Sequence, residues 1–235
     1  MTRAMSVVAA CGVLLGVGLA GIGCSARSGR SHRHAVGVAS DDATVNHRFE
    51  DAEDWARRFE DPTRDGWQRP DEVIAALALT PDSRVADIGA ATGYFPIRVA
   101  RAVPDGVVYG VDIEPTLVNY LNLRARHEGV HNLVALVCLP DDPRIPEPVD
   151  CVLVVNTYHH IDSRVEYFRR VHESLRPGGR LVIVDFKEGS LPVGPSADHK
   201  IAAKQVISEL QAAGYRLDRR DELPYQYVLV FTVAE

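Results

Sequence analysis

Five short apolar runs, most of them separated by stretches with helical spacing, constrain the fold of this chain most strongly. They predict strands over residues 85–88, 107–111, 133–139, 151–155 and 180–186. Strands that are apolar along their whole length are typical of a parallel sheet covered by helices on both faces. Two alternating segments near the end, 215–220 and 225–233, predict an antiparallel hairpin. The fold class is therefore α/β: a doubly wound, seven-stranded, mostly parallel sheet in a three-layer sandwich with an antiparallel C-terminal hairpin.

Apolar residues elsewhere recur at helical spacing. They predict helices near residues 49–59, 70–79, 94–103, 115–129, 163–175 and 198–213. Ser163 followed by Glu166 is typical of a capped helix start. Residues 64–68 are expected to form a loop, in which Trp67 packs into the core, caps a helix or lies over a ligand.

The first residues have the features of a targeting signal. Arg3 precedes an uncharged stretch over 4–23, and Cys24 follows small residues. The stretch resembles a bacterial lipoprotein signal, in which Cys24 would be lipidated, although Gly21 stands where that family usually has Leu or Val. A retained membrane anchor and a cleaved soluble form are the alternatives. The resemblance implies a location in the cell envelope, by lipid anchor or export; without such processing the chain would be cytoplasmic.

Composition separates the rest of the chain into a linker and one folded unit. Residues 25–46 are rich in Ser, Gly, Arg and His and are expected to be a linker, without a metal site. The folded unit is expected over 47–235, with N-terminal helices over 47–80 and the sheet-containing core over 81–235. Cys138 ends one predicted strand and Cys151 begins another, so two buried thiols are expected and not a disulfide.

Charge argues against a nucleic-acid partner. The chain carries 26 basic and 32 acidic side chains, and its first 40 residues hold four arginines and no acid. The folded unit is therefore clearly acidic, whereas a nucleic-acid binder is expected to show a basic face. The sequence does not indicate an oligomeric state.

Polar residues gather where the predicted strands end. Gly89–Gly93 form a small-residue turn between the first strand and its helix, and Asp87 lies just before it. Asp112, the pair Asp141 and Asp142, the segment 156–160 and finally Asp185 follow the other strands. Ligands of doubly wound sheets bind at this edge, and an acid at the end of the second strand is placed to accept hydrogen bonds from a ribose.

Three segments in order make the prediction specific: Asp87-Ile-Gly-Ala-Ala-Thr-Gly93, Val111-Asp112-Ile113 and Leu175-Arg-Pro-Gly-Gly-Arg-Leu-Val-Ile-Val-Asp185. They resemble the motifs of class I S-adenosylmethionine-dependent methyltransferases, which have a Rossmann-like fold, and the resemblance covers roughly residues 70–235. The segment from Asn156 to His160 lacks the signature of nucleobase amino methylation and looks more like the small-molecule, quinone-type branch. The resemblance implies S-adenosylmethionine as cofactor and a small-molecule methyl acceptor.

The resemblance also implies roles for single residues. The predicted cofactor-binding residues are Asp87, Gly89, Ala91, Gly93, Asp112, Ile113, Asp141, Asp142 and Asn156. Ala91 departs from the family, which usually has glycine there. For the acceptor, His159, His160 and Tyr158 are the candidate catalytic bases, because histidine titrates near neutral pH.

Two other functions stay open at this point. A membrane-tethered protein that binds S-adenosylmethionine without catalysis is compatible with Ala91 and the signal-like start. A nicotinamide dehydrogenase shares the strand, turn and acid arrangement, but its turn is Gly-x-Gly-x-x-Gly and not Asp-x-Gly-x-x-x-Gly.

Overall fold

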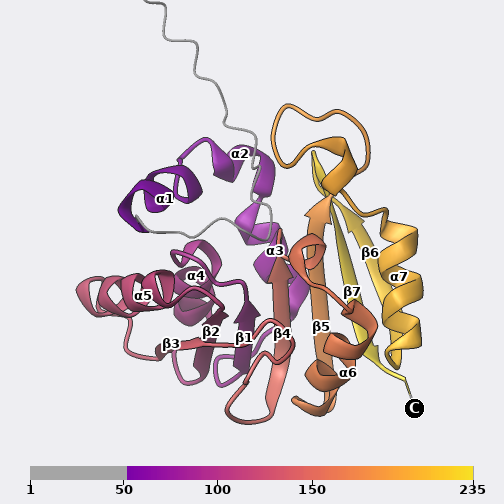
Figure 1. Ribbon diagram of the computed structural model, residues 1–235. Coiled ribbons are helices and arrows are strands. Elements are labelled where there is room, and N and C mark those ends of the chain that lie inside the picture. Colours follow the sequence, from indigo (N-terminus) through magenta and orange to yellow (C-terminus); the bar gives the residue numbers. More distant parts are fainter. Residues whose placement is uncertain (1–51, 235) are drawn as a thin grey trace, which may run out of the picture. The chain divides into compact units, whose positions relative to one another are not determined.

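A seven-stranded sheet forms the centre of the computed structural model, which describes residues 52–234. The strands are β1 (Arg84–Ile88), β2 (Val107–Asp112), β3 (Leu133–Val137), β4 (Val149–Val155), β5 (Leu175–Phe186), β6 (Tyr215–Glu222) and β7 (Gln226–Val233). Their order is β3-β2-β1-β4-β5-β7-β6. The first five are parallel, and β7 runs antiparallel to both β5 and β6 (Figure 1). The predicted fold class, including the C-terminal hairpin, is confirmed.

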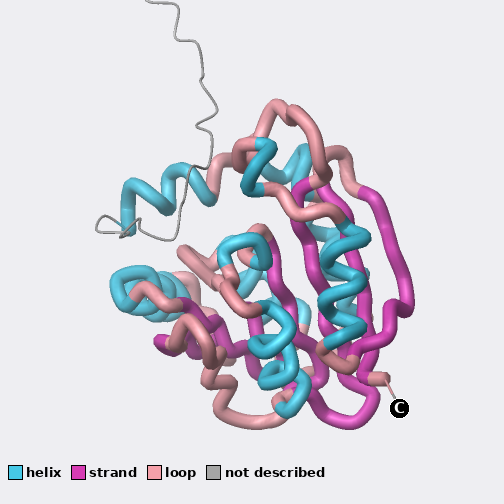
Figure 2. The backbone as a smooth tube through the Cα atoms, turned by 45° about the vertical axis from the view of Figure 1, so that its right-hand side comes forward, coloured by secondary structure: helices cyan, strands magenta, loops and turns pink. Residues whose placement is uncertain are grey.

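Helices cover both faces of this sheet (Figure 2). They are α1 (Ala52–Phe59), α2 (Arg64–Gln68), α3 (Pro70–Leu77), α4 (Tyr94–Ala102), α5 (Pro115–His127), α6 (Arg164–Glu173) and α7 (Ala203–Ala212). Buried residues of α3, α4 and α5 share one core with the sheet, and those of α6 and α7 share another. Neighbouring residues of β4 divide between the cores, since Leu153 belongs to the first and Val154 to the second. The three predicted layers are therefore present, and both faces of the apolar strands are buried.

The main error in the predicted elements lies at α2. The segment Arg64–Gln68 was expected to be a loop, but it forms a five-residue helix. Asp61 supports its start, because the Asp61 carboxylate accepts hydrogen bonds from the backbone N–H and the hydroxyl of Thr63, at 2.8 and 2.6 Å. In Figure 1, α1 and α2 lie above the carboxyl ends of the parallel strands.

Smaller differences concern element ends. The strand predicted from residue 180 already begins at Leu175, and its pairing with β4 shifts register between Val149 and Cys151. The predicted helix 198–213 is divided into a short 3₁₀ turn, Ala197–His199, and α7. The predicted side-chain cap at Ser163 is wrong: its hydroxyl makes no capping bond, and its backbone is left-handed, with φ at 47°.

The signal-like residues 1–24, the whole predicted linker 25–46 and the first three residues of the predicted first helix lie outside the described residues, and the envelope location stays a prediction. Among residues 52–234, no helix is long and apolar enough to span a membrane. Cys138 and Cys151 are free, buried thiols, as predicted. Burial raises the pKa of each of these thiols to about 12, so both stay protonated at neutral pH.

Candidate functional site

The turn between β1 and α4 lies against the end of β2. The backbone N–H groups of Gly89 and Ala90 both donate to the carbonyl of Val111, at 2.8 and 3.2 Å. Glycine is required at Gly89, because its φ is 78° and a Cβ there would overlap the side chain of Thr157. The turn is thus bound to β2 on one side and packed against the segment after β4 on the other.

Ala91 occupies the centre of this turn in a left-handed conformation, with φ at 45°. Its backbone N–H donates to Oδ2 of Asp112 at 2.9 Å. An alanine in this region costs about 1 kcal/mol relative to its preferred backbone, whereas glycine enters the region freely. Alanine at position 91, where the family usually has glycine, therefore strains the backbone of the turn.

Asp112 ends β2 and is buried, with both carboxylate oxygens bonded to backbone. Oδ1 accepts the N–H of Glu114 at 3.0 Å, and Oδ2 accepts that of Ala91. Burial raises the pKa of Asp112 above its usual value, although these two N–H groups oppose the shift. Each oxygen still has acceptor capacity, because a carboxylate offers about four lone-pair sites.

Asp87 lies just before the turn and is 3% exposed. Burial, and next the charge of Asp112, raises the pKa of Asp87 well above its usual value, while the charge of Arg64 opposes the rise. A buried carboxyl group whose ionisation is disfavoured by burial and by a neighbouring acid is stabilised in its charged form by a nearby cation.

The ends of β2 and β3 expose apolar side chains next to each other. Asp112 pairs with Val137 across these strands, and Ile113 follows Asp112. Ile113, Val137 and Leu139 are three of the exposed large apolar residues, with 56% of Ile113 accessible. The sequence singled out Ile113 but not the other two, which only the strand pairing brings beside it. Such an apolar surface suits the face of an aromatic base.

Asp141 and Asp142, two of the predicted cofactor-binding residues, lie in a tight turn after β3. Leu139 and Asp142 exchange both backbone hydrogen bonds, at 2.9 and 3.2 Å, and Asp141 is exposed between them. Oδ1 of Asp142 accepts the backbone N–H of Arg144 at 2.9 Å. The turn thus lies after β3, next to the end of β2, as a ligand across both strands requires.

Asn156 follows β4 with left-handed backbone, and its side chain belongs to a ring of three amides. Gln68 of α2 donates to Gln226 of β7 at 2.5 Å, Gln226 donates to Asn156, and Asn156 donates to Gln68 at 3.4 Å. Both glutamines are fully buried. The Asn156 amide thus holds the segment after β4 to α2 and β7. No pattern in the sequence pointed to Gln68 or Gln226, which lie 158 residues apart.

Tyr158 is not placed to meet an acceptor. Its ring is buried against Phe168, at 5.2 Å between centroids, and its hydroxyl donates to Glu209 of α7 at 2.7 Å. Burial and this acceptor raise the pKa of Tyr158. The prediction of Tyr158 as a catalytic base is therefore wrong, because the ring belongs to the core beneath α6 and α7.

His159 pairs with Asp185 at the end of β5. Its Nδ1 lies 2.9 and 3.0 Å from the two carboxylate oxygens, and the side chains are only 5% and 1% exposed. Oδ1 of Asp185 also accepts the backbone N–H of Phe186, at 2.8 Å. The sequence placed Asp185 at this edge without assigning it a role, since a contact across 26 residues cannot be derived from spacing.

The rings of His160 and His159 are in tilted contact, with centroids 4.1 Å apart and an angle of 44° between their planes. Burial, and next the charge of His159, lowers the pKa of His160 to about 4. His160 is therefore neutral at physiological pH and a weak base. His199 instead bonds the Ser196 hydroxyl in an exposed loop, at 3.0 Å.

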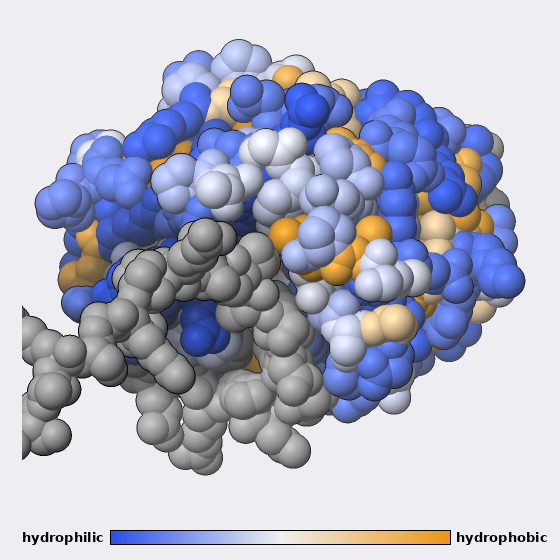
Figure 3. Space-filling view, turned by 90° about the horizontal axis from the view of Figure 1, so that it is seen from above, coloured by the Kyte–Doolittle hydropathy of each residue, from blue (hydrophilic) through white to orange (hydrophobic). Residues whose placement is uncertain are grey.

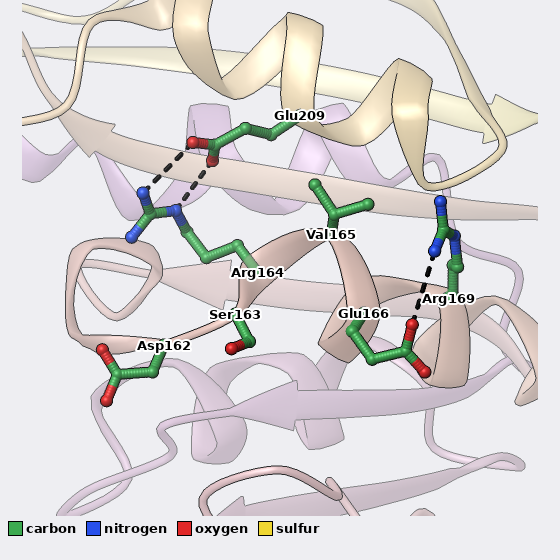
Figure 4. A pocket seen from close by; sticks show the side chains of 7 residues that line it. All are labelled: Asp162, Ser163, Arg164, Val165, Glu166, Arg169 and Glu209. Atoms are coloured by element: carbon green, nitrogen blue, oxygen red, sulfur yellow. Dashed lines mark hydrogen bonds and ion pairs between the residues drawn. The ribbon is translucent and has the colours of Figure 1, made fainter.

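A hollow of about 520 Å³ lies between α6 and α7 (Figure 4). Its lining residues are Asp162, Ser163, Arg164, Val165, Glu166, Arg169 and Glu209. Four of the charged lining side chains form ion pairs: Arg164 with Glu209, and Arg169 with Glu166. None of the predicted site residues lines this hollow. Figure 3 looks down on the strand-end edge, whose described surface is mostly hydrophilic with separate hydrophobic areas.

A doubly wound sheet with two buried acids around a small-residue turn defines a nucleoside-binding α/β protein. Residues 86–181 match the family described as methyltransferase domain. The structure of a SAM-dependent methyltransferase from Aquifex aeolicus shares the fold, with a TM-score of 0.73 at 23% identity, over 78% of this chain and 99% of that chain. The domain match and the shared fold support a class I S-adenosylmethionine-dependent methyltransferase, with S-adenosylmethionine as its cofactor.

Three relatives illustrate the range of acceptors around this chain. It is 34% identical to 27-O-demethylrifamycin SV methyltransferase of Amycolatopsis mediterranei, over 54% of this chain and 47% of that protein. It is 31% identical to tRNA U34 carboxymethyltransferase of Desulfotalea psychrophila, over 50% and 36%. It is 24% identical to the ubiquinone/menaquinone C-methyltransferase UbiE of Geobacter sp., over 67% of each. The alignments thus span about half or less of the first two relatives.

Proposed function

We propose that this chain transfers a methyl group from S-adenosylmethionine to a hydroxyl group of a small molecule. The observation that carries the choice of a hydroxyl acceptor is the buried pair of His159 and Asp185. A hydroxyl must lose its proton as it is methylated, whereas a thioether or a tertiary amine has none to lose. A histidine that is oriented by a carboxylate can accept that proton as a general base.

The residues at the strand ends suit the cofactor. Asp112 has acceptor capacity for the ribose hydroxyls, and Ile113 exposes an apolar side chain for adenine. Asp87 would hold the positively charged end, where ionisation of its carboxyl is favoured by a cation. When bound, the cofactor supplies an electrophilic methyl group on a sulfonium.

The hydrogen bond between His159 and Asp185 sets which nitrogen is the base. A carboxylate only accepts, so Nδ1 carries the proton that it donates to Asp185. Nε2 of the neutral ring is then the nitrogen with a lone pair, and it takes the proton of the acceptor hydroxyl. Asp185 stabilises the imidazolium that results and acts as a positioning residue.

A small aromatic acceptor suits the surroundings best. Trp67 of α2 packs against Phe186 and Tyr225, with centroids 5.8 and 6.5 Å away, and Phe186 directly follows Asp185. This packing supports a structural role for Trp67, and Phe186 connects the aromatic cluster to the strand end that carries Asp185. The acidic charge of the chain disfavours tRNA, although one relative is named for it. The relatives are named as methyltransferases and lend no support to a binding protein without catalysis.

Radiolabelled S-adenosylmethionine and a panel of phenols, catechols and hydroquinones test this proposal with the full chain. We expect label in at least one hydroxylated acceptor. His159→Asn should lower kcat by roughly 100-fold or more while the cofactor Kd changes little. His172→Asn, which changes a histidine away from the proposed site, is the matched control and should leave kcat unchanged.

Two results would contradict the proposal. Label that enters only tRNA, or only carbon, would refute the hydroxyl acceptor. Full activity in His159→Asn would show that the transfer needs no base there.

A further inference from the structure

Arg64 of α2 reaches over the start of α4. Its guanidinium carbon lies 3.8 Å from the ring centroid of Tyr94, the first residue after the small-residue turn. Nη1 of Arg64 donates to the backbone carbonyl of Phe59 at 2.8 Å, and this bond fixes the orientation of the Arg64 side chain. A cation is thus held over the helix start that follows Gly93.

The same side chain faces the segment after β4. Nε and Nη2 of Arg64 contact Oε1 of Gln68 at 3.4 and 3.3 Å, and Asn156 donates to that same oxygen. Arg64 also lies near enough to Asp87 to oppose the rise of the Asp87 pKa. The guanidinium therefore contacts both the start of α4, through Tyr94, and the glutamine that Asn156 binds after β4, and its charge acts on Asp87.

The amino-acid end of S-adenosylmethionine carries an ammonium and a carboxylate. Asp87 provides the negative charge for the ammonium, and the carboxylate needs a positive partner in the same place. The bonds from Arg64 to Gln68 are longer than the usual 2.7–3.2 Å, so a carboxylate with charge-assisted bonds competes well for these donors.

We propose that Arg64 binds the carboxylate of the cofactor's amino-acid end, with α2 thereby forming one wall of the cofactor site. This inference rests on the proposed cofactor binding. A purely structural Arg64, tying α2 to Tyr94, is the rival explanation. The two differ in one respect: a structural residue affects every ligand of the site alike, whereas a carboxylate partner affects only ligands that have the carboxylate.

Calorimetry with two ligands separates these explanations. S-adenosylhomocysteine has the amino-acid end, and 5′-methylthioadenosine lacks it. In the full chain, Arg64→Met should weaken S-adenosylhomocysteine roughly 10- to 100-fold and change the Kd of 5′-methylthioadenosine less than about twofold. Arg64→Lys keeps the charge without the bidentate fork and should lie between Arg64→Met and the wild type.

Arg98→Met is the matched control. Arg98 contacts the same Tyr94 ring, at 4.0 Å, and pairs with Asp65 at 3.2 Å. Its loss should leave both affinities unchanged, and circular dichroism verifies that each variant is folded.

Three outcomes would overturn the inference. Equal weakening of both ligands in Arg64→Met would assign a structural role, and no weakening of S-adenosylhomocysteine would remove Arg64 from the site. A wild-type chain that binds neither ligand would refute the proposed cofactor binding itself, and the inference with it.

Discussion

The raised pKa of Asp87 makes the stability of the ligand-free fold depend on pH. Its folded pKa is raised, so the folded state holds this proton more tightly than the unfolded chain does. The ionised carboxyl therefore destabilises the ligand-free fold. This penalty is absent below the unfolded pKa of about 4 and grows as the pH rises towards the folded value.

Asp87→Asn should consequently unfold at higher urea concentration than the wild type near neutral pH, with no such gain at a pH of about 4. The same change should weaken S-adenosylmethionine by roughly tenfold or more, because the cation loses its partner. Urea titrations at the two pH values and calorimetry measure both effects. Exposed Asp105 is the control, and Asp105→Asn should change neither. A variant that is less stable at both pH values would contradict this account of Asp87.

Ala91 permits a second test at the residue scale. Ala91→Gly should raise the free energy of unfolding by up to about 1 kcal/mol, because relief of the left-handed backbone outweighs the added freedom of the unfolded chain. The neighbouring Ala90 is buried and lacks a positive φ, so Ala90→Gly should lower the free energy of unfolding by about 1 kcal/mol. Equal losses in the two variants, measured by urea unfolding, would show that Ala91 carries no strain. Tighter cofactor binding in Ala91→Gly would add that its methyl group hinders the ligand.

Among the elements, α2 was the least predictable, and it carries Arg64, the proposed partner of the cofactor carboxylate. Five residues with an internal glycine are too short to show helical periodicity. Its function comes from contacts across the chain, Arg64 with Tyr94 and Gln68 with Gln226. In contrast, the strands were predicted well, since each is an apolar run and each core-facing side chain follows from alternation.

The amide ring predicts a large effect for a distant glutamine. Gln226→Leu should lower the free energy of unfolding by about 2–3 kcal/mol, because Asn156 and Gln68 each lose a buried partner. Gln211 lies exposed on α7, and Gln211→Leu should stay within about 0.5 kcal/mol of the wild type. Urea unfolding of the two variants makes the comparison. A Gln226→Leu change as small as that of Gln211→Leu would mean that the ring contributes little to stability.

At the scale of the whole molecule, the sequence predicted which acids lie at the strand ends better than it predicted the contacts of the segment after β4. Asp87, Asp112 and the turn between them follow from the order of strands, because parallel strands bring their carboxyl ends to one edge. The pairing of His159 with Asp185, and the burial of Tyr158 against Phe168, depend on side-chain directions after β4 that no spacing rule supplies. The proposed hydroxyl acceptor therefore rests on the contact of His159 with Asp185 and not on a sequence motif.

Calorimetric titration of S-adenosylmethionine into the full chain, wild type and Asp112→Ala, tests the central claim most directly. We predict saturable binding to one site in the wild type and a Kd at least roughly tenfold higher in Asp112→Ala, since the ribose loses a buried carboxylate acceptor. Circular dichroism verifies that the variant is folded. No binding by the wild type, or equal affinity in a folded Asp112→Ala, would contradict the claim that this edge of the sheet holds the cofactor.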